Sequence, residues 1–109
     1  MDSVLTYLAQ SRPAGTSAVT LYSPTQPQQP ILKRIWIVNT SAGTAKYSLY
    51  FDNDGTTYDQ TTAVAYQIQL GAGVTEYIDL EIPMNVSTGN FAIQTSVASA
   101  FNFTLFGEL

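Results

Sequence analysis

Hydrophobic and polar residues alternate through most of the chain after residue 31. Every second position is apolar in the tracts 64–70, 78–82 and 101–105. Because successive side chains of a β-strand point to opposite faces of its sheet, this period of two predicts strands with one dry and one wetter face. No helical period competes with this alternation after residue 10. The pattern therefore favours an all-β protein.

Turn-forming residues divide these tracts into short strands. The segment 31–39 is the strongest of them, because its centre is apolar on both faces, as in a central strand. The expected strands are residues 18–22, 31–39, 46–52, 63–70, 74–82, 91–97 and 100–105. Seven or eight strands at this spacing predict a single antiparallel β-sandwich, jelly-roll or Ig-like in its path, with an N-terminal arm.

The N-terminal segment allows three interpretations. It could be a short helix capped by Asp2 or Ser3, an extended arm, or the first strand of its own sheet. As an arm, it would add a strand to a neighbouring protein or lie across it. We therefore expect an arm or first strand over residues 1–12 and a sandwich domain over 13–109. The apolar side chains that would make the contact are Val4, Leu5, Tyr7 and Leu8.

The chain is unusually poor in charge. Only 11% of its 109 residues are charged, against about 25% in ordinary globular proteins. Such a surface is covered either by neutral polar side chains or by neighbouring proteins. Four Lys and Arg with a net charge of −4 argue against nucleic acid and against an acidic membrane. The start Met-Asp-Ser lacks a basic region followed by an apolar run, so we expect no signal peptide.

The residues offer little for catalysis. The chain has no His and no Cys, which are the usual general bases and nucleophiles. Asp79 and Glu81 fall on one face of an expected strand, about 7 Å apart by the pleat repeat. An exposed polar strand face explains this pair more simply than a glycosidase site does. We predict no enzymatic activity, no catalytic residues and no cofactor.

One acidic turn resembles the start of a calcium loop. Asp52-Asn53-Asp54-Gly55 is followed shortly by Asp59, and hard cations bind carboxylate oxygens around tight turns. An EF-hand loop also needs Glu at its twelfth position, where this chain has Ala63. Asp52, Asp54 and Asp59 are candidate cation ligands, but an Asp-rich hairpin turn is the simpler interpretation.

The aromatic residues divide by their parity along the strands. Five share the parity of their aliphatic neighbours and are expected in the core: Tyr47, Phe51, Tyr66, Phe101 and Phe103. Four have the opposite parity and are interface candidates on the second face of a sheet: Trp36, Tyr50, Tyr77 and Phe106. Such a face suits a protein interface or the stacking of a glycan. Ordinary cross-strand pairing would favour the same residues.

The ordered run of strand and turn motifs resembles a family of small virion proteins of tailed bacteriophages. The motifs are TLYSP (20–24), IWIVN (35–39), YSLYFDNDGTTY (47–58), MNVSTGNFAIQ (84–94) and FTLFG (103–107). The resemblance implies a capsid cement or decoration protein that binds the major shell protein and stabilises the particle. The alternatives are a tail or baseplate accessory protein and a glycan-binding module.

This resemblance also implies where the chain works and with what. It would be made in the cytoplasm of the host bacterium and incorporated into the virion, with the major capsid or a tail protein as partner. Together with the low charge, it leads us to expect a homo-oligomer, with a trimer favoured, and neither nucleic acid nor membrane as a partner.

Overall fold

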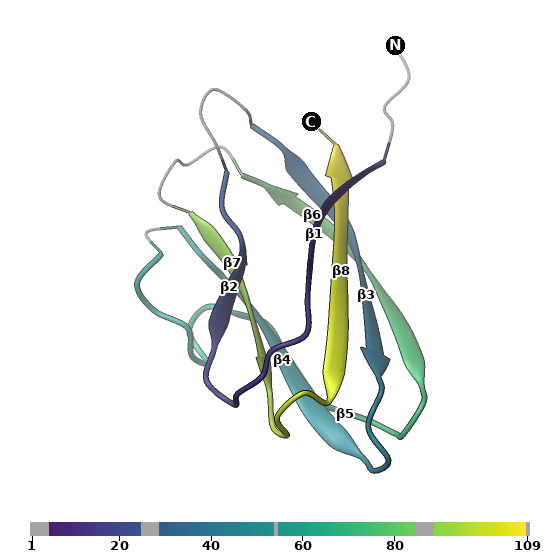
Figure 1. The fold of residues 1–109 in the computed structure, drawn as a ribbon. Helices are drawn as coiled ribbons and strands as arrows, with labels where there is room; N and C mark the ends of the chain where they lie inside the picture. The colour runs from purple at the N-terminus through teal and green to yellow at the C-terminus, as the bar shows by residue number, and fades with distance from the viewer. Residues whose placement is uncertain (1–4, 25–28, 54, 85–88, 109) are drawn as a thin grey trace.

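The computed structural model describes residues 5–24, 29–53, 55–84 and 89–108, and these form eight strands and no helix (Figure 1). The strands are β1 (Thr6–Ser11), β2 (Val19–Tyr22), β3 (Ile31–Asn39), β4 (Ala45–Asp52), β5 (Ala63–Leu70), β6 (Thr75–Pro83), β7 (Asn90–Thr95) and β8 (Phe101–Glu108). In this described part of the chain, no helix could cross a membrane. The predicted all-β class is confirmed.

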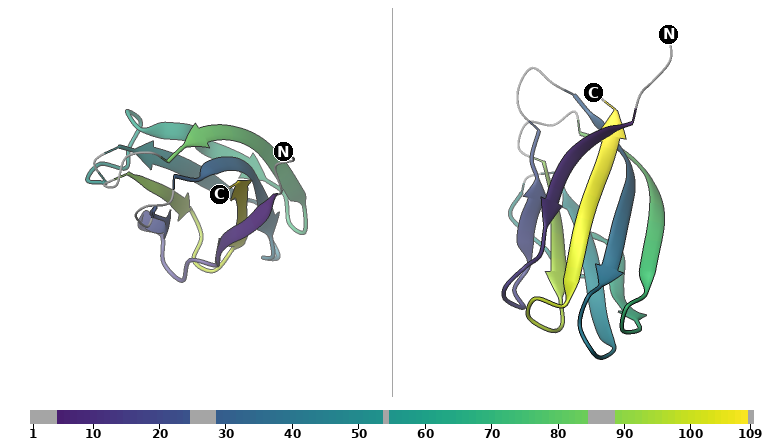
Figure 2. Two further views of the ribbon diagram at one scale, coloured as in Figure 1. Left: turned by 90° about the horizontal axis from the view of Figure 1, so that it is seen from above. Right: turned by 45° about the vertical axis from the view of Figure 1, so that its right-hand side comes forward.

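The strands form two four-stranded sheets in the orders β1-β8-β3-β6 and β2-β7-β4-β5. We call them sheet A and sheet B. Figure 2 shows the strands of sheet A side by side in its right-hand view. In both sheets the first half of the chain pairs with the second: β1 with β8, β2 with β7, β3 with β6 and β4 with β5, all antiparallel. A long hairpin folded over itself in this way is a jelly roll, so the jelly-roll path is confirmed over the Ig-like one.

The core lies between the sheets and consists of the inward-facing residues of both. Its fully buried apolar side chains come mainly from β3, β4, β7 and β8, and include Leu32, Ile35, Ile37, Leu49, Phe91, Ile93 and Leu105. Tyr47, Phe101 and Phe103 are also buried there, and Phe51 packs against the cluster. For these four aromatic residues the parity prediction is confirmed.

The parity prediction is wrong for Tyr66. Its side chain is 37% exposed, and that of Val64 on the same face is 42% exposed. Ala65 faces inward instead and packs against the core. The alternation along β5 therefore indicates a strand correctly but assigns the wrong face to its first half.

A bulge in β5 causes this reversal. Tyr47 pairs with Ile68, whereas Leu49 pairs with Ala65, so two steps along β4 match three steps along β5. The extra residue shifts the adjoining side chains toward the start of β5, Tyr66 among them, to the opposite face. Gln67 lies at this point with a φ of 50°, a left-handed conformation that few residues other than glycine adopt.

The N-terminal segment forms a strand rather than a helix over Thr6–Ser11, where β1 pairs with β8. Leu8 and Ala9 pack against the core from this strand. Tyr7, between Thr6 and Leu8, is 58% exposed on the other face. β1 is thus an edge strand of sheet A with its own buried contacts.

Candidate interaction surface

Four aromatic side chains form a row across the outer face of sheet A, with one residue from each strand. We call them the aromatic row: Tyr7 of β1, Phe106 of β8, Trp36 of β3 and Tyr77 of β6. Trp36 is 41% exposed and Tyr77 is 63% exposed. The Trp36 ring centroid lies 4.8 Å from that of Phe106 and 5.5 Å from that of Tyr77. The rings of Phe106, Trp36 and Tyr77 therefore make one continuous aromatic surface, and strand pairing places Tyr7 beside Phe106.

Strand register brings these residues together. Tyr7 is the direct partner of Phe106, and Trp36 is the direct partner of Tyr77. Side chains at directly opposed positions of an antiparallel pair lie on the same face, about 5 Å apart at their Cβ atoms. Three of the interface candidates from parity, Trp36, Tyr77 and Phe106, are brought together here with Tyr7 from the N-terminal segment.

Two ion pairs lie beside the aromatic row on the same sheet. Arg34 Nε lies 2.9 Å from Asp79 Oδ1, and Lys33 Nζ lies 3.3 Å from Glu81 Oε1. They line a shallow hollow of about 570 Å³ together with Leu5. Because both pairs are exposed to solvent, each contributes little to stability. Asp79 and Glu81 thus each face a basic side chain, and the surface combines an aromatic centre with a charged border.

The remaining aromatic candidate, Tyr50, lies on the outer face of sheet B. Parity predicts that face, yet the side chain is only 2% exposed. Its ring centroid lies 6.2 Å from that of Tyr58 and 6.5 Å from that of Tyr66, and its hydroxyl donates to Gln94 Oε1 at 2.5 Å. Tyr58, which belongs to the loop after β4, covers the Tyr50 ring on this face. Strand parity carries no information on a contact with a loop residue.

The carboxylates of the acidic turn bind the protein's own loop. Asp52 accepts hydrogen bonds from the backbone amides of Thr56 and Thr57 at 2.9 and 2.6 Å. Asp59 accepts from the hydroxyl and the amide of Thr61, and these two bonds lower the pKa of Asp59. Within the described residues, no three His, Cys, Asp or Glu side chains gather as they would around a metal ion.

Two predicted candidates, Val4 and Asp54, lie outside the described residues. The other two apolar candidates of the N-terminal segment behave differently from each other. Leu5 is exposed, whereas Leu8 packs against the core.

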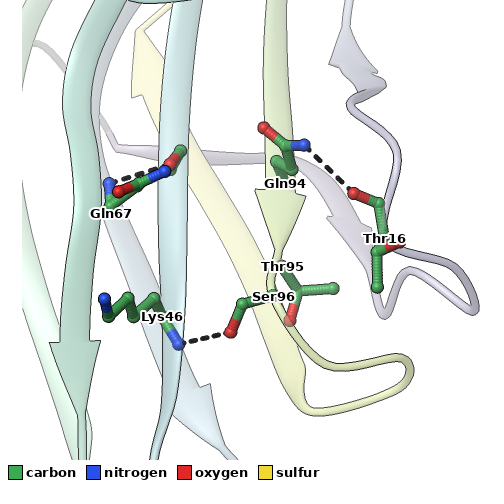
Figure 3. A pocket seen from close by; sticks show the side chains of 7 residues that line it. Thr16, Lys46, Gln67, Gln94, Thr95 and Ser96 are labelled. Atoms are coloured by element: carbon green, nitrogen blue, oxygen red, sulfur yellow. Dashed lines mark hydrogen bonds between the residues drawn. The ribbon is translucent and has the colours of Figure 1, made fainter.

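A polar pocket on the outer face of sheet B was not predicted from the sequence. It has a volume of about 330 Å³ (Figure 3). Its lining includes Thr16, Lys46, Ser48, Gln67, Gln94 and Ser96. They come from the loop before β2 and from β4, β5 and β7, with Ser96 directly after β7. No local motif could have indicated the pocket, because the residues are up to 80 positions apart.

Comparisons with known proteins bear on the fold. No protein-family model and no curated protein matches this chain. The solved coat protein of tobacco streak virus is similar in structure, with a TM-score of 0.51, 7% identity, and coverage of 98% of this chain and 86% of that one. A structure of infectious bursal disease virus, Gx strain, has a TM-score of 0.45 and 18% identity over all of this chain but only 30% of that one. At such low identity, the likeness to the coat protein concerns the fold.

Proposed function

We propose that this chain is a non-enzymatic structural component of a bacteriophage virion, a cement or decoration protein that binds the major shell protein through the aromatic row. The observation that carries the proposal is one sheet face on which Tyr7, Trp36 and Tyr77 are exposed and the half-buried Phe106 packs against Trp36. The motif resemblance to virion proteins of tailed bacteriophages supports it.

The composition of this face suits a protein partner. Interfaces are enriched in Trp and Tyr at their centre and carry charged residues at their rim. The aromatic row corresponds to the centre of such an interface. The ion pairs Arg34–Asp79 and Lys33–Glu81 correspond to its charged rim. Burying the rings under a shell protein removes apolar surface from water, which favours binding.

The fold supports the same role. The coat protein of tobacco streak virus has a similar structure, and jelly rolls recur among viral capsid domains. Since a fold hosts many functions, this likeness adds to the argument from the aromatic row and does not replace it.

We propose further that the chain forms a homo-oligomer, a trimer, through β5. This strand lies at the edge of sheet B. Its exposed apolar side chains are Val64, Tyr66 and Ile68. An unpaired apolar edge is a template for another chain. A contact between this edge and a different surface of the next copy closes into a ring when the rotation allows it.

Incorporation into particles tests the attachment site. The variant Trp36→Ser/Tyr77→Ser should leave the melting temperature within a few degrees of the parent, because both side chains are exposed, yet it should not appear in purified virions. The matched control Val19→Ser/Val97→Ser changes two exposed apolar residues that belong neither to the aromatic row nor to β5, and it should be incorporated like the parent. Full incorporation of Trp36→Ser/Tyr77→Ser would refute the role of the row.

Two further measurements test the remaining parts of the proposal. Electron microscopy with a labelled chain should place the label on the head; a label on the tail would replace the cement role by that of a tail accessory protein. Sedimentation equilibrium should give three times the 11.8 kDa chain mass, and Val64→Lys/Ile68→Lys should give a monomer. A parent chain that sediments as a monomer would refute the oligomer.

A further inference from the structure

The polar pocket of sheet B lies on the face of the sandwich opposite the aromatic row. Figure 3 shows Lys46 from β4, Gln67 from the neighbouring β5, and Gln94 from β7 around it. Because the two sheets face away from each other, a ligand in this pocket and a protein on the aromatic row would not compete. Occupation of this pocket is therefore independent of the proposed attachment through the aromatic row.

Lys46 gives the pocket a positive charge that nothing in the described residues neutralises. Lys33 and Arg34 form ion pairs, and Arg12 Nε donates to a backbone carbonyl at 3.0 Å. Within the described part of the chain, the ammonium of Lys46 alone among the four cations has no protein partner. An anionic group placed beside this ammonium would be stabilised by its charge.

The neighbouring hydroxyls of Ser48 and Ser96 each act as an acceptor toward the protein's own backbone. Ser48 Oγ accepts a hydrogen bond from the backbone amide of Gln67 at 2.9 Å, and Ser96 Oγ accepts from the backbone amide of Lys46 at 2.9 Å. Since a hydroxyl both accepts and donates, each can still donate to a ligand. The side-chain amide of Gln67 adds two donors and an acceptor. The pocket is thus rich in donors and carries one positive charge.

One wall of the pocket is fixed by the protein. Gln94 Nε2 donates to the backbone carbonyl of Thr16 at 3.0 Å, and Gln94 Oε1 accepts from the buried hydroxyl of Tyr50 at 2.5 Å. These bonds hold the Gln94 amide in one orientation before any ligand arrives. Such preorganisation lowers the entropy that binding would otherwise cost.

The opposite wall is formed at a strained residue. Gln67 has a φ of 50° at the bulge of β5, and bulges often redirect a side chain beside a functional site. Unfavourable backbone conformations of this kind also gather at binding sites. Gln67 thus both lines the pocket and has the unfavourable backbone conformation.

We infer that this pocket binds an acidic monosaccharide, a pyranose that carries a carboxylate. Lys46 would pair with the carboxylate, while Ser48, Ser96 and Gln67 would bind ring hydroxyls. The volume of about 330 Å³ is at the lower end of small-molecule sites, which begin near 300 Å³. A sugar uses several of these donors at once, whereas a small inorganic anion needs only those near Lys46.

Titration of the ¹⁵N-labelled protein with D-glucuronate, followed by amide chemical shifts, tests this inference. We expect saturable shifts around Lys46, Gln67 and Ser96 with a dissociation constant of about 1 mM, as befits one charged and a few neutral hydrogen bonds. D-glucose, which lacks the carboxylate, should bind at least about tenfold more weakly. Sodium phosphate should not reproduce the shifts around Gln67.

Two matched lysine variants separate the pocket from a general charge effect. Lys46→Met should weaken glucuronate binding about tenfold or more, because it removes a charge-assisted hydrogen bond. Lys33→Met removes the same charge on sheet A and should leave binding unchanged. Unaltered amide shifts away from residue 46 show that Lys46→Met is folded.

Three outcomes would overturn the inference. The first is the absence of saturable shifts with D-glucuronate. In the second, D-glucose binds equally well, so that Lys46 plays no part. In the third, phosphate gives the same shifts with the same affinity, which makes the pocket a site for any small anion.

Discussion

The hydroxyl of Tyr47 on β4 donates a hydrogen bond to the carboxylate of Glu76 on β6, and this bond joins sheet B to sheet A. The Tyr47 ring is buried and meets Phe101 edge-on, with centroids 5.7 Å apart and planes at 75°. Burial, and secondarily the bond to Glu76 and its negative charge, raise the pKa of Tyr47 well above its usual value.

This raised pKa predicts a loss of stability at alkaline pH. A group whose pKa is higher in the folded state stabilises the fold fully below its unfolded pKa, about 10 for tyrosine, and loses that contribution as pH rises toward the folded value. We expect the free energy of unfolding, measured in urea, to fall above about pH 10 by up to about 1.4 kcal/mol per pH unit from this residue. Tyr22, whose pKa burial also raises, adds to the fall.

The variant Tyr47→Phe isolates the contribution of this residue. At neutral pH it should lower the free energy of unfolding by about 1–2 kcal/mol, because Glu76 loses a donor. Above pH 10 its stability should decline less steeply than that of the parent. An equally steep decline would mean that Tyr47 does not ionise on unfolding.

The sequence was sufficient for the strands but not for their pairing. β-prone segments, turn residues and, after residue 31, the alternation located the centre of every strand from β2 onward, because burial on one face dictates such a pattern locally. The choice between jelly-roll and Ig-like paths depends on contacts such as Tyr7 with Phe106, nearly the whole chain apart, for which local pattern carries no signal. The same limit hid the polar pocket, whose residues come from separate strands.

The wrong face predicted for Tyr66 and the wrong exposure expected for Tyr50 also have local causes. Tyr66 is exposed because the bulge at Gln67 shifts the parity of β5, and a glutamine gives no sign of a bulge. Tyr50 lies on its predicted face but is covered by Tyr58, a residue of the loop. The aromatic row was more accessible to sequence analysis, because β3, β6 and β8 keep regular parity through Trp36, Tyr77 and Phe106.

Gly107 on β8 should not tolerate a side chain. A Cβ atom there would lie 2.4 Å from the backbone oxygen of Ile31 and 2.7 Å from Leu8 Cδ1. Since the oxygen belongs to the adjacent strand, Gly107→Ala has to move backbone, and we expect it to lower the free energy of unfolding by about 1–3 kcal/mol. Thermal unfolding measures this, with the open position Gly43→Ala as control. A Gly107→Ala protein as stable as the parent would contradict the close packing of β8.

Tyr7 and Leu8 are neighbours on β1 with opposite roles. Leu8→Ala removes core contacts and should lower the free energy of unfolding by about 2 kcal/mol, toward the lower limit for such truncations because the site is only partly buried. Tyr7→Ser removes an exposed ring and should change stability by less than about 0.5 kcal/mol while reducing incorporation into particles. Urea unfolding and particle composition measure the two effects. If Tyr7→Ser incorporates fully, the aromatic row does not extend to β1.

Gln67 links stability to the proposed ligand. Glycine adopts its φ of 50° without steric cost, which offsets the entropy that glycine loses on folding. Gln67→Gly should therefore match or exceed the parent in stability by up to about 1 kcal/mol, whereas Gln67→Val should lose about 2 kcal/mol or more because a β-branched residue resists this conformation.

Gln69 provides the matched control for this residue. It is also exposed on β5, but its φ is not positive, so Gln69→Gly should lower the free energy of unfolding by about 0.5–1 kcal/mol. The two glycine variants should thus change stability in opposite directions or differ clearly in size. If the Gln67→Gly protein is more stable yet binds D-glucuronate more weakly, the Gln67 side chain contributes to ligand binding at the expense of stability. Equal losses in both variants would show that the bulge stores no strain.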